Sequence, residues 1–151
     1  MNDVKKPTGL PRTVAFRLGT VGAVVADRFA ARIEELDLKP KHAGLMTALS
    51  HGEAASQQEL AGRLGVAPSL VVALADHLER LGAIERVRDP ADRRRQVLRL
   101  TAHGHTLLAA CEQAARELDD ELTAGMTAEQ RTALQRALGV LAAEAGLPTG
   151  E

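Results

Sequence analysis

The stretch Ile84-Glu85-Arg86-Val87-Arg88-Asp89-Pro90-Ala91-Asp92-Arg93-Arg94-Arg95-Gln96-Val97-Leu98-Arg99-Leu100-Thr101 decides the fold of this chain. Alternating segments flank Asp89-Pro90, a dipeptide that favours a turn, so the stretch is predicted to form a β-hairpin with arginines at its tip. On the second strand we expect Leu98 and Leu100 on one face and Val97 on the other. Six arginines against three acids give the stretch a net charge of +3 in a chain of net charge −1, which favours contact with phosphate.

The composition excludes several classes of protein. The chain has 151 residues, which fits one domain or one domain with an appendage, and 45% of them are apolar, enough for a core. With two Phe, no Trp and no Tyr, aromatic stacking on single strands or RNA is not expected. The single cysteine, Cys111, leaves no disulfide framework and no thiolate metal site. We expect a cytoplasmic protein without a membrane partner, because no signal-peptide pattern or membrane-length apolar run is present.

A long helical pattern runs from about Leu10 to Leu36, with Pro11 in its first turn. Its apolar residues follow helical spacing along a single stripe: Val14, Leu18, Val21, Val25, Phe29, Ile33 and Leu36. A helix of about 25 residues would be about 37 Å long, more than a small core needs. We therefore expect this helix to pack against another chain.

Short helices occupy the segment between this long helix and the hairpin. Pro40 opens one that stops near Gly52, and Ser56-Gln57-Gln58-Glu59 is a capping box that begins the next. Gly65 ends that helix, Pro68 opens another, and Gly82 ends it. The last of these carries a core stripe of Val71, Leu74, Leu78 and Leu81. Two short helices joined around one glycine and followed by a basic hairpin predict a winged helix-turn-helix.

The rest of the chain is predicted to be two more helices. Thr101 caps the first, Gly125 interrupts the pattern, and Thr127-Ala128-Glu129-Gln130 is a second capping box. Leucines at helical spacing stripe the last helix, which ends at Gly146 and Pro148. The predicted fold class is thus mainly α, with one small β-hairpin.

Three segments together resemble the multiple-antibiotic-resistance regulator (MarR) family: residues 59–66, 78–86 and 89–104. The specific signals are the Asp92-Arg93-Arg94 of the hairpin and the Leu-Thr-x-x-Gly that follows it. The resemblance implies a homodimeric winged helix-turn-helix transcription factor. It implies that residues 1–36 and 102–151 form the helical dimerisation region and residues 37–101 the DNA-binding lobe. Two recognition helices would enter successive major grooves of a pseudo-palindromic operator, with the wings in the flanking minor grooves.

The resemblance also assigns candidate DNA-binding residues. In the recognition helix they are Pro68, Ser69, Leu70, Val72, Ala73, Asp76 and His77. In the wing they are Asp92, Arg93, Arg94 and Arg95, of which Arg94 is expected to enter the groove while Asp92 orients the loop. Phosphate contacts are expected from Ser56, Gln57 and Gln58 at a helix start. Because apolar residues stand where the family usually has Ser, Thr and Arg, base reading by the helix is expected to be modest.

An effector site is also implied, since the family often binds small anionic aromatic molecules between the dimer helices and the DNA-binding lobe. Candidate ligand residues are Phe16, Arg17, His42 and Met46, for which packing or surface roles are the plainer interpretation. Cys111 lies on an apolar stripe and is expected to be a buried small hydrophobe. No metal site is expected, since the five histidines are scattered, and no cofactor is expected either.

Two interpretations other than a ligand-responsive repressor stay open at this stage. One is a MarR-like dimer that has lost specific DNA reading and acts through protein contacts, which the apolar recognition helix would fit. The other is a small helical enzyme, which no motif supports, so the chain is expected not to be an enzyme.

Overall fold

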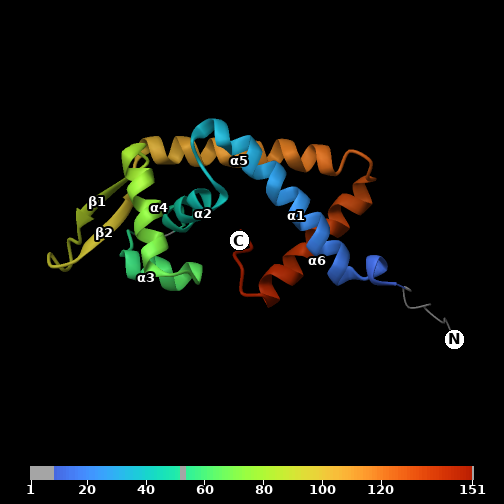
Figure 1. Cartoon of the computed structure of the whole chain (residues 1–151), viewed down its shortest axis with the longest axis horizontal. Helices are drawn as coiled ribbons and strands as arrows, with labels where there is room; N and C mark the ends of the chain where they lie inside the picture. Colours follow the sequence, from blue (N-terminus) through green and yellow to red (C-terminus); the bar gives the residue numbers. More distant parts are fainter. Residues whose placement is uncertain (1–8, 52–53, 151) are drawn as a thin grey trace. The chain divides into compact units, whose positions relative to one another are not determined.

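The computed structural model describes residues 9–51 and 54–150, in which ten elements follow one another (Figure 1). They are η1 (Leu10–Arg12), α1 (Val14–Ile33), η2 (Glu34–Leu36), α2 (Pro40–Ser50), α3 (Gln57–Leu64), α4 (Pro68–Arg80), β1 (Ile84–Arg88), β2 (Gln96–Leu100), α5 (Ala102–Leu122) and α6 (Ala128–Glu144). The chain forms two compact units that meet within α5, one ending at Ala115 and the other beginning at Arg116. None of the helices in the described ranges combines the length and hydropathy that a membrane span requires.

The first helix is shorter than the sequence predicts. The hydroxyl of Thr13 accepts a hydrogen bond from the Phe16 amide (3.2 Å), so Thr13 caps α1, and Pro11 lies in the 3₁₀ turn before it. At the other end, Asp37 adopts a left-handed conformation (φ 57°), which stops the chain after η2. The helix predicted from Leu10 to Leu36 is therefore α1 flanked by two 3₁₀ turns.

The helix-turn-helix has the boundaries that its capping signals predict. Ser56 Oγ accepts from the Glu59 amide (3.1 Å), and Glu59 Oε2 accepts from the Ser56 amide (3.3 Å), which completes the capping box of α3. Gly65 ends α3 at φ 64°, and Gly82 follows α4 at φ 72°, both in the region that glycine alone enters without strain. The predicted unit of two helices and a hairpin is confirmed.

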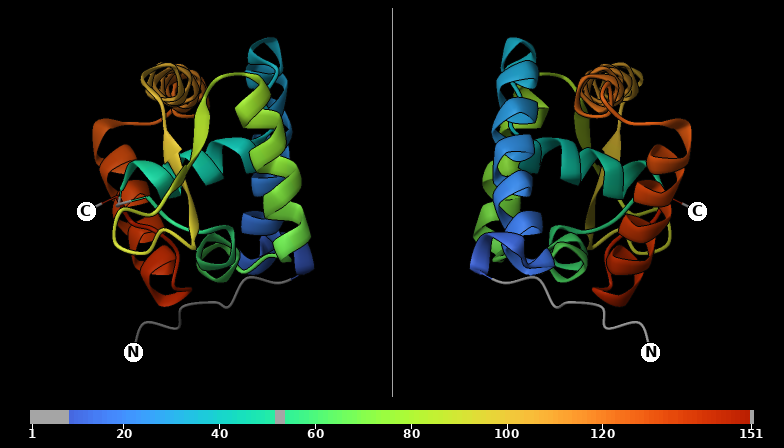
Figure 2. Two further views of the ribbon diagram at one scale, coloured as in Figure 1. Left: turned by 90° about the vertical axis from the view of Figure 1, so that its left-hand side faces the viewer. Right: turned by 90° about the vertical axis from the view of Figure 1, so that its right-hand side faces the viewer.

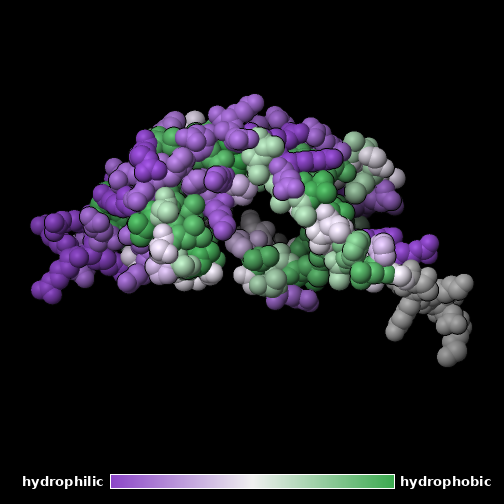
Figure 3. All heavy atoms as spheres, viewed as in Figure 1, coloured by the Kyte–Doolittle hydropathy of each residue, from purple (hydrophilic) through white to green (hydrophobic). Residues whose placement is uncertain are grey.

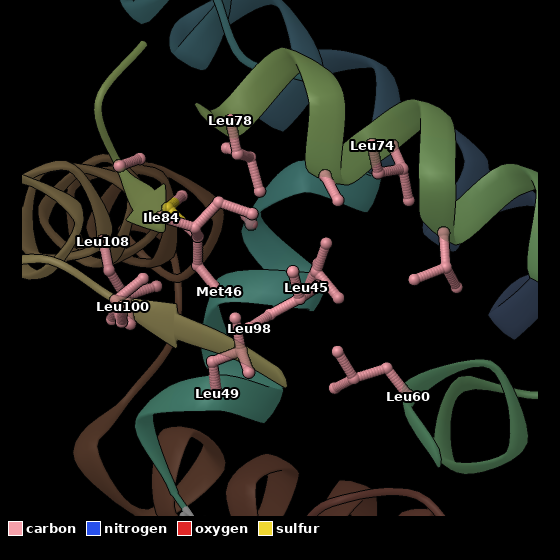
Figure 4. Close-up of a cluster of buried hydrophobic side chains, with 14 of the residues drawn as sticks. Leu45, Met46, Leu49, Leu60, Leu74, Leu78, Ile84, Leu98, Leu100 and Leu108 are labelled. Atoms are coloured by element: carbon pink, nitrogen blue, oxygen red, sulfur yellow. The ribbon is translucent and has the colours of Figure 1, made fainter. Parts of the chain in front are cut away.

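Side chains from every element of this unit meet in one core. Figure 4 shows Leu45 and Met46 of α2, Leu60 of α3, Leu78 of α4 and Leu98 of β2 pointing toward one another. All five are buried with at most 1% of their surface exposed. Burying a side chain of this size contributes about 1.5–3 kcal/mol, so this cluster holds the helix-turn-helix to its hairpin.

The hairpin is antiparallel and has an additional partner. Ile84 pairs with Leu100, and β2 also forms a bridge to Ala55, whose amide and carbonyl both bond to Leu98 (3.3 and 2.8 Å). Leu98 faces the core as expected, and Val97 on the opposite face is buried as well, at 2% exposure. In both views of Figure 2 the strands lie beside α2, which contacts β2.

A tight junction joins the hairpin to α5. Thr101 donates its amide to the Ala83 carbonyl (2.9 Å) and its hydroxyl to the Gly82 carbonyl (2.6 Å), and its Oγ1 accepts from the Gly104 amide (3.0 Å). Gly104 is buried, and a Cβ there would meet the Ala83 carbonyl and lie 2.7 Å from Leu100 Cδ1. Close packing thus explains the Leu-Thr-x-x-Gly motif.

Candidate nucleic-acid interface

The solvent face of α4 is short of polar groups. Val71, Leu74 and Leu78 are buried in the core, while Pro68, Ser69, Val72 and Ala73 are exposed. Leu70 differs from the expectation, because its side chain is half-buried and packs against the core. Ser69 and the half-exposed carboxylate of Asp76 are the polar side chains on this side of α4 before its last turn, where Glu79 and Arg80 are exposed. This is a poor set for reading base edges.

His77 faces the protein rather than the solvent, contrary to the expectation for this residue. Its Nε2 lies 2.6 Å from the carbonyl oxygen of Asp37, and its ring stacks on that of His42 with centroids 4.4 Å apart. The left-handed turn at Asp37 presents the carbonyl that holds the ring there. His77 therefore ties α4 to the corner between η2 and α2.

The candidate ligand residues fall into two groups. His42 and Met46 are buried at 6% and 0% exposure, and His42 Nδ1 accepts from the Lys39 amide (2.9 Å). Burial, followed by the neighbouring His77 and Lys39, lowers the pKa of His42 below its ordinary value. Phe16 and Arg17 are instead exposed on α1, where Arg17 Nε donates to the Pro11 carbonyl (3.1 Å). Within the described residues, the buried pair His42 and Met46 and the exposed pair Phe16 and Arg17 therefore do not share one open surface.

Two aspartates fold the tip of the hairpin. Asp89 Oδ1 accepts from the Ala91 amide (2.9 Å), and Asp92 Oδ1 accepts from the Arg94 amide (3.1 Å). The Asp89 amide donates to the Arg95 carbonyl (2.8 Å), which closes the loop. The side chains of Arg93 and Arg94 are left on the outside, and Figure 3 shows the hydrophilic surface of this tip.

The six arginines of the hairpin have different environments. Arg86 pairs with Asp76 and Glu79, Arg95 with Glu59 and Asp89, and Arg99 with Glu85. Arg88 donates to the Arg93 carbonyl (3.2 Å). Within residues 9–51 and 54–150, no carboxylate pairs with the side chain of Arg93 or Arg94. These two guanidinium groups therefore offer positive charge at the tip to a phosphate or a narrow groove.

The start of α3 lies next to the hairpin at the point where the tip loop ends and β2 begins. A cavity of about 370 Å³ is lined by Ser56, Gln57, Gln58, Glu59, Arg95 and Gln96. The side chain of Gln58 is exposed, while Gln57 Oε1 accepts from Arg86 (3.3 Å) and Ser56 is occupied in the capping box. The hydrogen bond from Arg95 lowers the pKa of Glu59. Arg95 is thus held at α3 and ties the end of the tip loop to that helix.

Arg86 and His77 have structural partners that the sequence alone did not indicate. Arg86 bonds to residues 10 and 29 positions away, and His77 to one 40 positions away. Acids at positions 76 and 79, three residues apart on one helix, were the available signal for a cationic partner. Nothing in the local sequence identifies which arginine of the hairpin that partner is.

The cysteine and the two histidines of α5 form no further candidate site among the described residues. Cys111 is 2% exposed, as predicted, and burial raises the pKa of its thiol. His103 and His105 are exposed, and the described residues contain no cluster of three or more His, Cys, Asp or Glu with metal-binding geometry.

These features together define a winged helix-turn-helix protein: a helix pair with an exposed second helix, followed by a hairpin with unpaired arginines at its tip. The model of the MarR family matches residues 36–95, which cover α2 through the tip of the hairpin. Together with the relatives below, this match supports a MarR-family winged helix-turn-helix regulator, in agreement with the resemblance seen in the sequence.

Similar proteins of known type support this assignment. A transcriptional regulatory protein for the hcr operon of Thauera aromatica is 33% identical over 60% of this chain, and the match spans 55% of that relative's length. The HTH-type transcriptional repressor Rv2887 of Mycobacterium tuberculosis is 28% identical over 87% of this chain and 94% of its own. The repressor CouR, solved on a 23-mer DNA duplex, is 29% identical, with a TM-score of 0.75 over 91% of this chain and 97% of its own.

Proposed function

We propose that this chain represses transcription by binding a pseudo-palindromic operator as a homodimer. The unpaired Arg93 and Arg94 at the folded tip of the wing carry the proposal, because the other wing arginines are engaged within the protein. CouR and Rv2887 have both been solved with DNA, and both share this fold over most of their length. The wing, residues 84–100, would reach the minor groove while α4 lies in the major groove.

The recognition helix α4 and the wing would contribute unequally to the affinity for DNA. The exposed face of α4 offers Ser69 as its one hydroxyl, together with apolar groups suited to thymine methyls. No side chain of the described residues caps the start of α4. Pro68 has no N–H and the Leu70 amide donates to the Ala67 carbonyl (3.0 Å), so Ser69 supplies the backbone amide that a phosphate could meet there. Gln58 is exposed for a similar contact at α3. Affinity would thus come mainly from phosphate contacts and from the wing.

The proposed division of the chain follows from the same assignment. Residues 37–101 would form the DNA-binding lobe, and residues 1–36 with 102–151 the dimerisation region. The apolar side chains that α1 and α6 each expose support the second part, because a dimer would cover them. A cytoplasmic location and the absence of catalytic activity are part of the proposal, as for other regulators of gene expression.

The wing is tested by removing one free arginine and one paired arginine. Arg94→Ala should strongly weaken binding to an operator fragment and reduce the slope of log affinity against log salt by about one. Arg99→Ala, on the same hairpin but paired with Glu85, serves as the matched control and should change the slope little. Fluorescence anisotropy at several salt concentrations measures both, and an unchanged affinity for the Arg94→Ala chain would refute the role of the wing.

The alternative, a dimer that acts through protein contacts without reading DNA, makes a different prediction. Random genomic fragments presented to the chain at two salt concentrations should yield a saturable preference for some of them if the chain is an operator-binding repressor. Uniform, salt-sensitive binding to all fragments would favour the alternative, since phosphate contacts carry no sequence information.

We also propose that a small anionic aromatic molecule releases the DNA. Arg17, exposed on α1 beside Phe16, is the cation that a carboxylate would meet, whereas His42 and Met46 lie within the core. Aromatic carboxylates titrated into the protein–DNA complex should lower its anisotropy, and Arg17→Gln should reduce this response. Release that is equal in both chains would remove Arg17 from the site.

A further inference from the structure

Arg86 connects three elements of the DNA-binding lobe through one guanidinium. Its Nη2 lies 2.6 Å from Asp76 Oδ1 and 3.3 Å from Gln57 Oε1, and its Nη1 lies 3.0 Å from Glu79 Oε1. The side chain starts on β1, Asp76 and Glu79 belong to α4, and Gln57 opens α3. At 18% exposure the side chain of Arg86 is more buried than those of its two acidic partners, which are 48% and 45% exposed.

The two acids need a partner of this kind. Asp76 and Glu79 are three residues apart and share one side of α4, where their like charges repel each other. Arginine presents several N–H donors in a rigid fork, so a single side chain bonds to both carboxylates and still reaches an amide oxygen. A lysine in this place has one ammonium and no fixed fork, so it would not hold all three partners in one geometry.

The position of Asp76 makes this pairing relevant to DNA. Asp76 is seven residues after Ser69 and three after Ala73, so all three lie along the exposed side of α4. An uncompensated carboxylate there would face the phosphates that the helix approaches. Arg86 neutralises it from the protein side, and the same bonds fix α4 against the wing and against α3.

We infer that Arg86 is a positioning residue for operator recognition, which acts through Asp76, Glu79 and Gln57 and donates no bond to DNA. It sets the angle of α4 relative to the wing, so that both contact the operator together. This inference rests on the proposed DNA-binding function. It separates Arg86 from Arg93 and Arg94, which share its charge but have no carboxylate partner in the described lobe.

The test compares sequence-selective binding with general binding. The wild-type chain first selects an operator from a pool of random duplexes. The affinities of Arg86→Gln are then measured for that operator and for a random duplex of equal length. A positioning residue predicts that the operator affinity falls by about tenfold or more, as for loss of a hydrogen bond to a charged group. The affinity for the random duplex should fall by much less. Arg99→Gln, which breaks the wing pair with Glu85, should leave the ratio of the two affinities unchanged.

A combined variant supplies a readout that a phosphate contact would not give. In the Arg86→Gln, Asp76→Asn, Glu79→Gln chain the two unpaired carboxylates are gone. We expect it to regain part of the operator affinity and to keep the wild-type salt slope. The contrary outcome is that Arg86→Gln loses equal affinity for both duplexes and shows a slope of log affinity against log salt that is lower by about one. If the combined variant did not restore that slope, Arg86 would be a phosphate ligand and the inference would be overturned.

If Arg86→Gln fails to fold, as judged by its thermal transition, the acids are changed while the arginine is kept. The Asp76→Asn, Glu79→Gln chain should then bind random duplexes more tightly, because Arg86 is free, and should show a lower ratio of operator to random affinity. An unchanged ratio would overturn the inference. A wild-type chain that selects no duplex from the pool would instead refute the proposed function itself.

Discussion

Gly104 shows how one residue sets the junction between the wing and the helix that follows it. Its amide donates to Thr101 Oγ1, and the space where a Cβ would lie is taken by the Ala83 carbonyl and by Leu100. Neither neighbour is the flexible end of a long side chain. The carbonyl also accepts from the Thr101 amide, so it has little freedom to move away.

Gly104→Ala is therefore expected to destabilise the fold by about 1–3 kcal/mol, the usual range for forcing a methyl group into a packed site. Urea unfolding followed by circular dichroism measures the loss. Gly139→Ala is the matched control, since nothing lies within 4 Å of a Cβ at that position of α6. It should be neutral or stabilising by up to about 1 kcal/mol, because alanine favours helix. Equal stability of the two variants would contradict the close contact.

At the scale of an element, α2 depends on a histidine at its first turn. His42 Nδ1 accepts the Lys39 amide, and this bond requires that the nitrogen carry no proton. The ring is buried against His77, with Lys39 close by, while the carboxylate of Asp37 acts in the opposite direction. These surroundings lower the pKa of His42 in the folded chain below the value of 6.5 that it has when exposed.

The sign of the resulting pH dependence follows from proton uptake. Below pH 6.5 the unfolded chain binds a proton at His42, whereas the folded chain stays unprotonated there until a lower pH. Stability should therefore fall as the pH decreases from 6.5 toward the pKa of His42 in the folded chain. Urea midpoints at pH 8 and pH 5.5 measure the loss. His42→Gln keeps an acceptor for the Lys39 amide without titrating there, so it should lose less stability over this range. His103→Gln, at an exposed site, should behave as wild type, and an equal pH response in all three chains would rule out His42 as the cause.

Local sequence signals predicted the helices and the hairpin, whereas contacts between residues far apart in the sequence determined the environments of the candidate DNA-binding side chains. The capping boxes at Ser56 and Thr127 and the glycine after α3 act within a few residues, so the sequence alone located these helix ends. The arginines of the wing could be counted from the sequence but not assigned. Whether one of them is free or paired depends on residues up to 36 positions away, as for Arg95 and Glu59. His77 was expected on the exposed side because helical spacing does not report the carbonyl at Asp37.

On the scale of the whole molecule, α1 and α6 each leave several large apolar side chains exposed. On α1 the exposed side chains include Val14, Leu18, Val21 and Val24, at 47–74% exposure. On α6 they include Leu134, Leu138, Val140 and Leu141, at 37–59%. Residues at helical spacing that remain outside the core of their own chain are typical of helices that pack against a partner.

A charge placed on these helices should separate the proposed dimer. Wild-type chain should sediment as a dimer, and Val21→Glu combined with Leu138→Glu should raise the dissociation constant by about a hundredfold or more, because an unpaired buried charge costs several kcal/mol. DNA binding should be lost in parallel. Val72→Glu, on the exposed face of α4, should lose DNA binding while it remains a dimer. Sedimentation velocity distinguishes the outcomes, and a wild-type monomer at micromolar concentration would contradict the assembly.

The bonds at Thr101 have a consequence for how the wing could change. Because Thr101 joins the end of β2 to Ala83 and Gly82, just before β1, the ends of the hairpin are held together at its base. The entropic cost of closing a loop rises slowly with the length of the loop, so extra residues at the tip would add little to the free-energy cost of folding. The loop from Asp89 to Arg95 is therefore open to insertion or replacement, whereas the base is not. New operator preferences could arise at the tip without a new fold beneath it.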